Sequence, residues 1–315
     1  MSSESLRTFR HRVEYWGVVG VMRVVSAIPR RMALACGTLL GFGFYLIDAH
    51  HRRLTIRNLQ RAFPLRPPRE LRRIARGVFG HFGRLLMEVL RFSSLSAEQK
   101  RSLIELEGDE RVRHALAQGR GVLLVTGHFG FWELQGMAHG LALPPINVVA
   151  RRLDNPGLND LLERVRQHTG NTVIYRSGGL RRIMRALHSN QTVAVLIDQH
   201  MGSADAVMVD FFDRPAATTS AVAALALRTG AAVIPAFSLP IENGRYRFIY
   251  EHAVPLPDAD SPDPIRELTQ RCTDVLEMYV RRYPDLWLWM HRRWRDEVVE
   301  GDRPMFPAGA SEELR

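Results

Sequence analysis

His128 and Glu133 are the two residues of this sequence whose types and spacing best fit acid–base chemistry. The apolar run at 122–125 predicts a short strand buried on both faces, and Thr126-Gly127 ends it. Helical spacing begins near Phe131, so Glu133 falls in a first helical turn, where a carboxylate is electrostatically favoured. We therefore expect His128 and Glu133 on either side of one tight turn.

The chemistry available to such a pair is general base catalysis. A carboxylate that bonds one imidazole nitrogen leaves the other nitrogen free to face a cleft as a base. For an arbitrary His and Glu at this spacing, a His that caps a strand and a solvated Glu are the commoner explanation. Gly127 and Gly130 beside the pair favour a functional site, because glycine lets the backbone approach a ligand closely.

The surrounding sequence predicts the scaffold that would position these residues. From about residue 105 to 255, apolar strands alternate with amphipathic helices, which predicts an α/β fold with a largely parallel sheet flanked by helices. Ligands bind such sheets at the carboxyl ends of the strands, where His128, Arg151 and Asp198 all fall. Besides 122–125, strands are expected at 146–150, 172–175, 192–197, 207–212, 231–237 and 246–252, and helices at 157–168, 180–188, 219–228 and 263–282.

The first hundred residues differ in character. Residues 32–47 carry no charge and have Arg on both flanks, but the run is shorter than the roughly 20 residues of a usual membrane span. A short span, a segment lying in the interface and a buried core helix all fit, and the flanking Arg and aromatic residues favour membrane attachment. Residues 67–92 predict an amphipathic helix. Eleven Arg against two Glu between residues 52 and 91 indicate contact with anionic head groups, although an ordinary solvated face would also fit.

The amino-acid composition limits the kinds of partner that this protein is expected to bind. With 315 residues, 46% hydrophobic and 24% charged, the chain can bury a sizeable core. A net charge of +10 points to a polyanion, namely nucleic acid, an anionic membrane or a phosphorylated substrate, unless codon bias accounts for the arginines. Nucleic-acid binding would leave both the 32–47 segment and the His128 turn without a purpose, so no nucleic-acid partner is expected.

Several chemistries lack their sequence signatures. There is no G-x-S-x-G, Walker, H-E-x-x-H or paired C-x-x-C motif. Cys36 and Cys272 stand far apart in unrelated contexts and suggest neither a disulfide nor a metal site. We therefore expect no metal and no cofactor.

The closing stretch runs from Trp287 to Trp294 and interleaves three Trp with His291, Arg292 and Arg293. It could pack over the sheet edge, or it could form an aromatic floor with cationic tips that hold a phosphate. The tail after Arg295 is expected to be loose. The sequence thus predicts a helical, membrane-associating region at 1–100, an α/β domain at 101–300 and a tail at 301–315.

Together these residues resemble the late lipid A acyltransferase family of the lysophospholipid acyltransferase superfamily, from about Arg53 to Trp294. The family's central motif, a His, four residues and an acid, appears as His128-Phe-Gly-Phe-Trp-Glu133. Further matches follow in the expected order: Asn58-Leu-Gln-Arg-Ala-Phe-Pro64, Arg151 ahead of Asp154-Asn155-Pro156, Asp198-Gln199, Phe211-Phe-Asp-Arg-Pro-Ala-Ala-Thr-Thr219, Ala226-Leu-Arg-Thr-Gly-Ala231 and Trp287-Leu-Trp-Met-His-Arg-Arg-Trp294. Members usually carry Asn where Phe131 stands and often Gly where Asp213 stands, and we expect both positions beside the site.

The resemblance implies transfer of a fatty acyl group from a thioester, on acyl carrier protein or coenzyme A, to a hydroxyl of a membrane glycolipid, with a lipid A precursor as the first candidate. Another lipid acceptor, such as a mannoside or an ornithine lipid, stays open. So does a lipid-binding or nucleic-acid-binding protein without catalysis. Since acyl thioesters are cytoplasmic, the implied location is the cytoplasmic face of the inner membrane, as a monotopic protein or with one N-terminal span.

The resemblance also implies roles for individual residues. His128 would be the base and Glu133 would fix its tautomer. Backbone N–H groups from Gly127 to Gly130 would stabilise the oxyanion. Among substrate-binding candidates, Arg151 would hold a phosphate or the developing charge, Asp198 would pair with an Arg or shape the pocket, and Arg292 would add a further cation.

Overall fold

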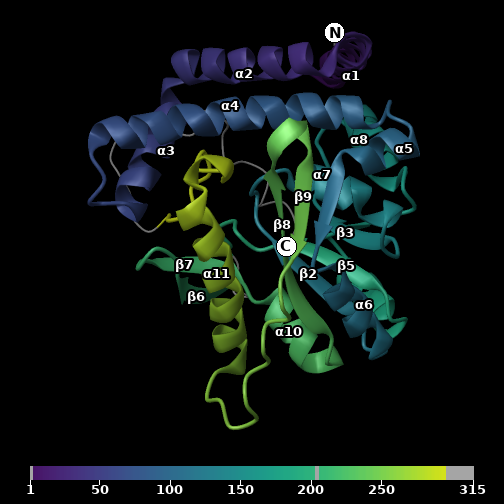
Figure 1. Ribbon diagram of the computed structural model, residues 1–315, viewed down its shortest axis with the longest axis vertical. Helices are drawn as coiled ribbons and strands as arrows, with labels where there is room; N and C mark the ends of the chain where they lie inside the picture. Colours follow the sequence, from purple (N-terminus) through teal and green to yellow (C-terminus); the bar gives the residue numbers. More distant parts are fainter. Residues whose placement is uncertain (1–2, 203–205, 296–315) are drawn as a thin grey trace.

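The computed structural model describes residues 3–202 and 206–295. Four long helices precede the first strand and lie at one end of the molecule (Figure 1): α1 (Ser3–Ala27), α2 (Arg30–Ile47), α3 (Ala49–Ala62) and α4 (Pro68–Phe92). The later helices are α5 (Ala97–Ser102), α6 (Asp109–Ala117), α7 (Trp132–Ala138), α8 (Pro156–Gln167), α9 (Leu180–His188), α10 (Ala221–Thr229) and α11 (Pro264–Arg282).

A seven-stranded sheet forms the centre of the fold, in the order β1-β9-β8-β2-β5-β3-β4. Its strands are β1 (Ile104–Glu107), β2 (Val122–Thr126), β3 (Ile146–Ala150), β4 (Thr172–Tyr175), β5 (Thr192–Leu196), β8 (Ala232–Pro240) and β9 (Tyr246–Tyr250). Apart from the antiparallel pair β8–β9, the neighbouring strands in this sheet run parallel. The predicted α/β fold with a mostly parallel mixed sheet is confirmed.

Strand β1 and helices α5 and α6 were not among the expected elements, and the region of β6 and β7 differs from the expectation. The strand expected at 207–212 forms as β6 (Ala206–Asp210) but pairs outside the main sheet, with β7 (Pro215–Thr219) in a separate hairpin. Strand β7 was not predicted, because its Pro, Ala and Thr residues lack an alternating pattern of large apolar side chains. The tail predicted to be loose lies at 296–315, outside the described residues.

Helix α4 joins the N-terminal helices to the sheet. Figure 1 shows it between the outer layer of α1 and α2 and the sheet. The predicted amphipathic pattern is confirmed: Leu71, Ile74 and Val78 are buried, whereas Arg72 and Arg76 are exposed. The helix begins with Pro68 in its first turn, where the missing N–H costs no hydrogen bond.

A row of glycines lets α2 lie directly on α4. At Gly37 an added Cβ would stand 2.5 Å from the carbonyl oxygen of Gly83, and at Gly41 it would overlap the carbonyl oxygen of Phe79. Gly37 therefore faces Gly83 while Gly41 faces Phe79, which shows that the two helices run antiparallel. Backbones this close gain dispersion energy along the whole seam, which no larger residue would permit.

A buried ion pair anchors the start of α2 to the rest of the fold. The Arg30 Nε donates to Glu88 Oε1 at 2.7 Å, and the Tyr246 hydroxyl donates to the same oxygen at 2.5 Å. Glu88 lies on α4 and is fully buried, and Tyr246 begins β9. The network thus joins α2, α4 and the sheet, and removing one partner would leave a buried charge without compensation.

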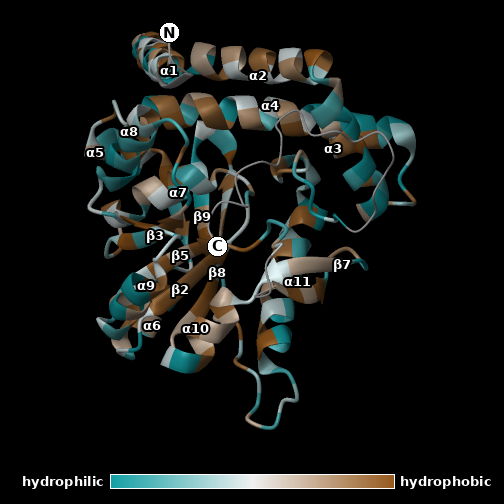
Figure 2. Cartoon of the chain, turned by 180° about the vertical axis from the view of Figure 1, so that it is seen from behind, coloured by the Kyte–Doolittle hydropathy of each residue, from teal (hydrophilic) through white to brown (hydrophobic). Residues whose placement is uncertain are grey.

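The apolar residues of α2 are visible as brown bands on the outer layer in Figure 2. Within residues 3–202 and 206–295, no single helix combines the length and hydropathy needed to cross a bilayer. Helices α2 and α3 meet this requirement only as a pair, and the pair is bent by 92°.

The glycine row yields a paired test of stability. Gly41→Ala should lower the free energy of unfolding by about 1 to 3 kcal/mol, because the new methyl group would overlap a backbone carbonyl that cannot move without shifting α4. Gly43→Ala, on the same helix with nothing near its Cβ, should be neutral or stabilising by up to about 1 kcal/mol. Urea unfolding followed by circular dichroism measures both, and equal effects of the two substitutions would contradict the close seam.

Candidate active site

His128 follows β2 after one intervening residue, at the carboxyl end of a central strand, as predicted. The residues on either side of it pack against protein rather than facing open space. At Gly127 an added Cβ would stand 3.0 Å from Asp198 Oδ2 and 2.9 Å from Leu276 Cδ1. Gly130 has a φ of +59°, and a Cβ there would overlap the carbonyl oxygen of Ser238. Both glycines thus bring the turn close to its own scaffold, whereas we had expected them to bring it close to a ligand.

Asp198, which follows β5, is the acid that orients His128. Its Oδ1 accepts a hydrogen bond from His128 Nδ1 at 2.8 Å, and its Oδ2 accepts one from the His128 backbone N–H at 2.6 Å. The Trp287 indole Nε1 also donates to Oδ2, at 2.9 Å. Because the carboxylate accepts at Nδ1, that nitrogen carries the proton in the neutral ring, which leaves Nε2 unprotonated as a base.

The electrostatics of this pair suit a base held by a charged acid. Burial alone would lower the pKa of His128, but the charge and the hydrogen bond of Asp198, and then the charge of Glu133, raise it above its ordinary value. Burial alone would raise the pKa of Asp198, but the charge of His128 and the hydrogen bonds from His128 and Trp287 hold it at about 2. Asp198 is therefore ionised at every physiological pH.

The side chains of His128 and Asp198 differ in solvent exposure, and this difference indicates different roles. The His128 side chain is 21% exposed and the Asp198 side chain only 2%. A substrate can therefore touch the imidazole but not the carboxylate behind it. We had listed Asp198 among the substrate-binding residues, and the structure instead places it behind the base.

Glu133 has a different partner from the one expected. Its carboxylate accepts two hydrogen bonds from Arg166 of α8, from Nη2 at 2.5 Å and from Nε at 3.1 Å. The prediction that Glu133 bonds the His128 ring and fixes its tautomer is wrong, because its oxygens face Arg166 while Asp198 occupies Nδ1. Glu133 is still close enough for its charge to raise the pKa of His128.

The backbone N–H groups of the turn are also occupied. The His128 N–H donates to Asp198, the Phe129 N–H donates to the Gly127 carbonyl at 2.7 Å, and the Gly130 N–H donates to the Leu286 carbonyl at 2.8 Å. Of the backbone N–H groups from Gly127 to Gly130 that were expected to stabilise the oxyanion, these three are therefore already bonded within the protein, and a role for the Gly127 N–H stays a prediction. Donors for a developing negative charge must come from groups other than these three.

Helix α4 supports the turn from the side that faces the N-terminal helices. The Nε2 atom of His81 lies 3.0 Å from the Gly130 carbonyl oxygen. Burial lowers the pKa of His81 to about 3, so the ring is neutral and its Nε2–H can donate to this carbonyl. Phe82 contacts Trp132, whose ring lies 5.2 Å from that of His128. We did not anticipate His81, although it stands three residues after Val78 and four before Leu85, on the buried face of the predicted helix.

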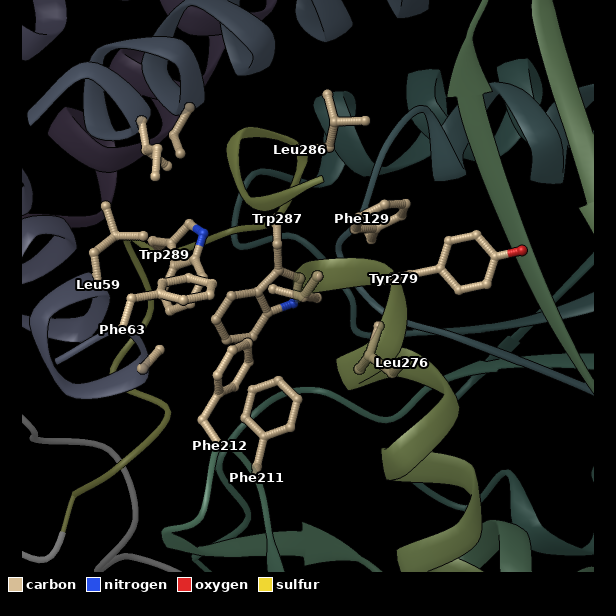
Figure 3. Close-up of a cluster of buried hydrophobic side chains, with 14 of the residues drawn as sticks. Leu59, Phe63, Phe129, Phe211, Phe212, Leu276, Tyr279, Leu286, Trp287 and Trp289 are labelled. Atoms are coloured by element: carbon tan, nitrogen blue, oxygen red, sulfur yellow. The ribbon is translucent and has the colours of Figure 1, made fainter. Parts of the chain in front are cut away.

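The closing tryptophans form the second support. Figure 3 shows Trp287 and Trp289 packed among Phe129, Phe211 and Phe212, and both indoles are almost completely buried. Of the two roles considered for this stretch, packing is the one that the structure shows, with the added bond from Trp287 to Asp198. His291 is not a cationic tip, because burial lowers its pKa to about 4.

The other predicted cations are Arg151 and Arg292, and within residues 3–202 and 206–295 no hydrogen bond or ion pair joins Arg151 to the reactive pair. Arg151 follows β3, its side chain is 80% exposed, and its Nη2 lies 3.4 Å from Asp154 Oδ1. Since β5 separates β2 from β3, the two strand ends are about 10 Å apart. Arg292 is partly buried, and its neighbour Arg293 is fully buried and donates to the Ala217 carbonyl at 2.7 Å. Binding of substrate by Arg151 or Arg292 stays a prediction.

Comparison with known proteins assigns the chain to a family. Residues 3–296 match the family model described as bacterial lipid A biosynthesis acyltransferase. The chain belongs to this family. It is therefore an O-acyltransferase, as the order of its motifs predicted.

The related proteins are named either as lipid A acyltransferases or as phosphatidylinositol mannoside acyltransferases. The chain is 28% identical over 285 residues to the lipid A biosynthesis lauroyltransferase of Escherichia coli strain K12, which covers 89% of this chain and 90% of that protein. It is 25% identical over 291 residues to the palmitoleoyltransferase of the same organism, covering 90% and 92%. It is also 27% identical over 232 residues to a phosphatidylinositol mannoside acyltransferase of Mycobacterium tuberculosis strain CDC 1551, covering 70% of each chain.

The two departures from the family pattern lie outside the reactive pair. Phe131 is buried in the core, with its ring 5.0 Å from that of His81 and 4.3 Å from that of Tyr246. Asp213, whose side chain is exposed, lies in the turn between β6 and β7 with a φ of +57°, a left-handed conformation that explains why glycine suits this position. Phe131 thus packs behind the turn that carries His128, while a role of Asp213 beside the site stays a prediction.

The site predicts a specific pH dependence. A base must be neutral to work, so kcat/KM should rise with pH through an apparent pKa above the ordinary 6.5 of His128. Asp198→Asn removes the charge that raises this pKa and cannot hold the same tautomer. It should shift the inflection to lower pH and reduce the plateau by about 10²- to 10⁴-fold.

Glu133→Gln is the matched control for this experiment. It removes only the weaker of the two charges that act on His128, so its inflection should also move to lower pH but by less than that of Asp198→Asn. The pH profile of acyl transfer by the three purified proteins measures this. A larger downward shift in Glu133→Gln than in Asp198→Asn would show that Glu133, not Asp198, controls the base.

Proposed function

We propose that this protein transfers a fatty acyl group from an acyl thioester, carried by acyl carrier protein or coenzyme A, to a hydroxyl of a membrane glycolipid. A lipid A precursor is the first candidate for the acceptor. The proposal rests on family membership and on one observation in the structure, the hydrogen bond between His128 Nδ1 and buried Asp198, which leaves Nε2 of a partly exposed ring as a base.

The geometry supports the following mechanism. The acceptor hydroxyl donates a hydrogen bond to His128 Nε2, which removes its proton as the oxygen attacks the thioester carbonyl carbon. The imidazolium that forms is stabilised by Asp198, as a buried charge pair with an aligned hydrogen bond. When the tetrahedral intermediate collapses, the carbon–sulfur bond breaks and the imidazolium returns the proton to the thiolate. The products are an ester and a free thiol.

Two further residues act indirectly in this proposal. Glu133 adds a second negative charge near the imidazole, which favours the protonated form that arises during the reaction. Arg166 holds Glu133 in place through its paired hydrogen bonds. Arg151 and Arg292 are proposed to bind phosphate groups of the acceptor, because arginine matches phosphate geometry with two parallel hydrogen bonds.

The proposed location is the cytoplasmic face of the inner membrane. Support comes from the acyl thioester donor, which is a cytoplasmic metabolite, and from the apolar residues exposed on α1 and α2. The similarity to a phosphatidylinositol mannoside acyltransferase supports one alternative acceptor, a mannosylated phospholipid in place of a lipid A precursor.

His128→Ala should abolish acyl transfer without unfolding the protein, because the side chain is partly exposed and Asp198 keeps two other donors. The expected loss is at least about 10²-fold. Mass spectrometry of lipids from cells that carry the wild-type or variant gene measures the gain of one acyl chain and names the acceptor class. His114→Ala, an exposed histidine on α6, should behave as wild type. Near-normal acylation by His128→Ala would refute the mechanism.

Purified protein then separates the candidate substrates. Acyl carrier protein and coenzyme A thioesters are each offered with a lipid A precursor or a phosphatidylinositol mannoside, and the acylated product is detected by its mass. Transfer to the mannoside alone would replace the first candidate acceptor, and transfer to neither would exclude both.

A further inference from the structure

The side chain of His291 lies near the reactive pair, although the mechanism above gives it no role. The Leu288 N–H donates to the His128 carbonyl oxygen at 3.1 Å, so the closing stretch runs alongside the turn after β2. The His291 N–H donates to the Leu288 carbonyl oxygen at 3.3 Å, so one short turn separates His291 from this contact. The charges of Asp198 and of His128 both shift the pKa of His291, as expected for neighbouring side chains.

Contacts with two other parts of the chain hold His291 in place. The His200 N–H donates to His291 Nε2 at 3.2 Å, which ties the ring to the segment that carries Asp198. The Asn58 side chain of α3 donates to the carbonyl oxygens of His291 and Trp289, both at 2.9 Å. Asn58 is almost completely buried, so this backbone has little freedom to move. The ring is therefore positioned before a substrate arrives, as electrostatic catalysis requires.

The protonation of His291 follows from its surroundings. Burial lowers its pKa to about 4, against a smaller opposing effect of the Asp198 charge, so the ring is neutral at physiological pH. Because Nε2 accepts the hydrogen bond from His200, the single ring proton is on Nδ1. Within residues 3–202 and 206–295, Nδ1 has no hydrogen-bond partner, and it is not sealed from solvent. His291 thus keeps one N–H donor available beside the site.

Three other side-chain donors of the closing stretch are committed elsewhere. The Trp287 indole donates to Asp198 at 2.9 Å, and the Trp289 indole donates to a backbone carbonyl oxygen at 2.6 Å. Arg293 is fully buried and donates to a carbonyl oxygen of β7 at 2.7 Å. None of these groups can turn toward a substrate without breaking a contact that holds the stretch, whereas His291 can donate without rearrangement.

The proposed reaction needs such a donor. When the hydroxyl oxygen attacks, the thioester carbonyl oxygen becomes the oxyanion of the tetrahedral intermediate, and a fixed N–H group stabilises that charge. The N–H groups of His128, Phe129 and Gly130 are already bonded within the protein. A neutral imidazole suits this role better than a cation, because a positive charge here would repel the His128 imidazolium that forms in the same step.

We propose that His291 is a second catalytic residue, whose Nδ1–H donates a hydrogen bond to the thioester carbonyl oxygen as that oxygen becomes negatively charged. The inference rests on the proposed function and supplies an oxyanion donor for it. No proton moves to or from His291. Its hydrogen bond strengthens as the carbon–oxygen bond becomes single and weakens when the carbon–sulfur bond breaks and the carbonyl reforms. The two histidines thus act in opposite senses, His128 as an acceptor of the hydroxyl proton and His291 as a donor to the oxyanion.

Steady-state kinetics of purified variants tests this role. His291→Ala should lower kcat by about 10²- to 10³-fold, the usual cost of losing one oxyanion donor, and should change KM by less than about threefold. His291→Asn keeps an N–H donor near the position of Nδ1 and should be at least about tenfold faster than His291→Ala. His252→Ala, an exposed histidine after β9, should behave as wild type. Wild-type kcat in His291→Ala would overturn the proposal, as would equal rates for His291→Asn and His291→Ala.

The pH profile separates a donor from a residue that only positions the base. Because the His291 ring binds the His200 N–H, its loss could displace Asp198 and so act through His128. The inflection of kcat/KM would then move to lower pH, as expected for Asp198→Asn. If His291 is the donor, Asp198 and Glu133 still act on His128, so the plateau should fall while the inflection stays at its wild-type pH. A downward shift as large as that of Asp198→Asn would refute the donor role.

Binding of two analogues tests the donor without turnover. Both carry the acyl chain on pantetheine, the group that acyl carrier protein and coenzyme A share. One has a phosphonate with the charge of the tetrahedral intermediate in place of the carbonyl, and the other is a thioether with a methylene there. His291→Ala should bind the phosphonate at least about tenfold more weakly than wild type and the thioether equally well, measured by calorimetry. Equal loss for both ligands, or loss for neither, would show that His291 does not respond to the developing charge.

The outcomes distinguish this inference from the function on which it rests. Analogue binding needs no acceptor, so it still decides the role of His291 if the acceptor lipid is a different one. Inactive His128→Ala together with fully active His291→Ala would remove only the role of His291. Wild-type protein that binds neither analogue would overturn the proposed function and this inference with it. Circular dichroism checks that His291→Ala is folded, which we expect because the backbone carbonyl that Asn58 binds is retained.

Discussion

The hydrogen bond from His128 to Asp198 is the interaction on which the rest of the active site depends. It joins the ends of two adjacent parallel strands, and it holds because a buried carboxylate receives three donors and keeps its charge. Gly127 permits the close approach, since any side chain there would push Asp198 away. Trp287, held in an aromatic cluster, supplies the third donor (Figure 3). A base of defined tautomer is thus built from residues more than 150 positions apart in the chain.

The fold contributes stiffness around this bond. The turn that carries His128 is fixed from below by Ser238 of β8 and from above by His81 of α4. The N–H groups of His128, Phe129 and Gly130 are bonded within the protein, to Asp198, Gly127 and Leu286, which explains why these positions offer no free donor to a substrate. The site therefore has a rigid base.

Sequence reasoning located the elements of the site better than their contacts. An unbroken apolar run followed by glycine was enough to place His128 at a strand exit, and a second such run placed Asp198 likewise. That β2 and β5 are neighbours depends on strand order, which a single sequence does not encode. Glu133 was given the wrong partner because the rotation of α7 against α8 decides where its carboxylate points. Arg166 left no signal at all, since it occupies an ordinary position of an amphipathic helix.

The shared use of α4 has a practical consequence for anyone who wishes to shorten this protein. Its glycines and the carbonyl of Phe79 are shielded from water by α2, and Glu88 is neutralised there by Arg30. A truncated protein that began after residue 47 would expose the face of α4 that α2 covers. It would also leave the buried Glu88 carboxylate without its Arg30 partner. Removing the apolar helices to gain solubility would therefore destabilise α4, which packs against the turn that carries His128. The N-terminal helices are thus needed for the stability of the active site.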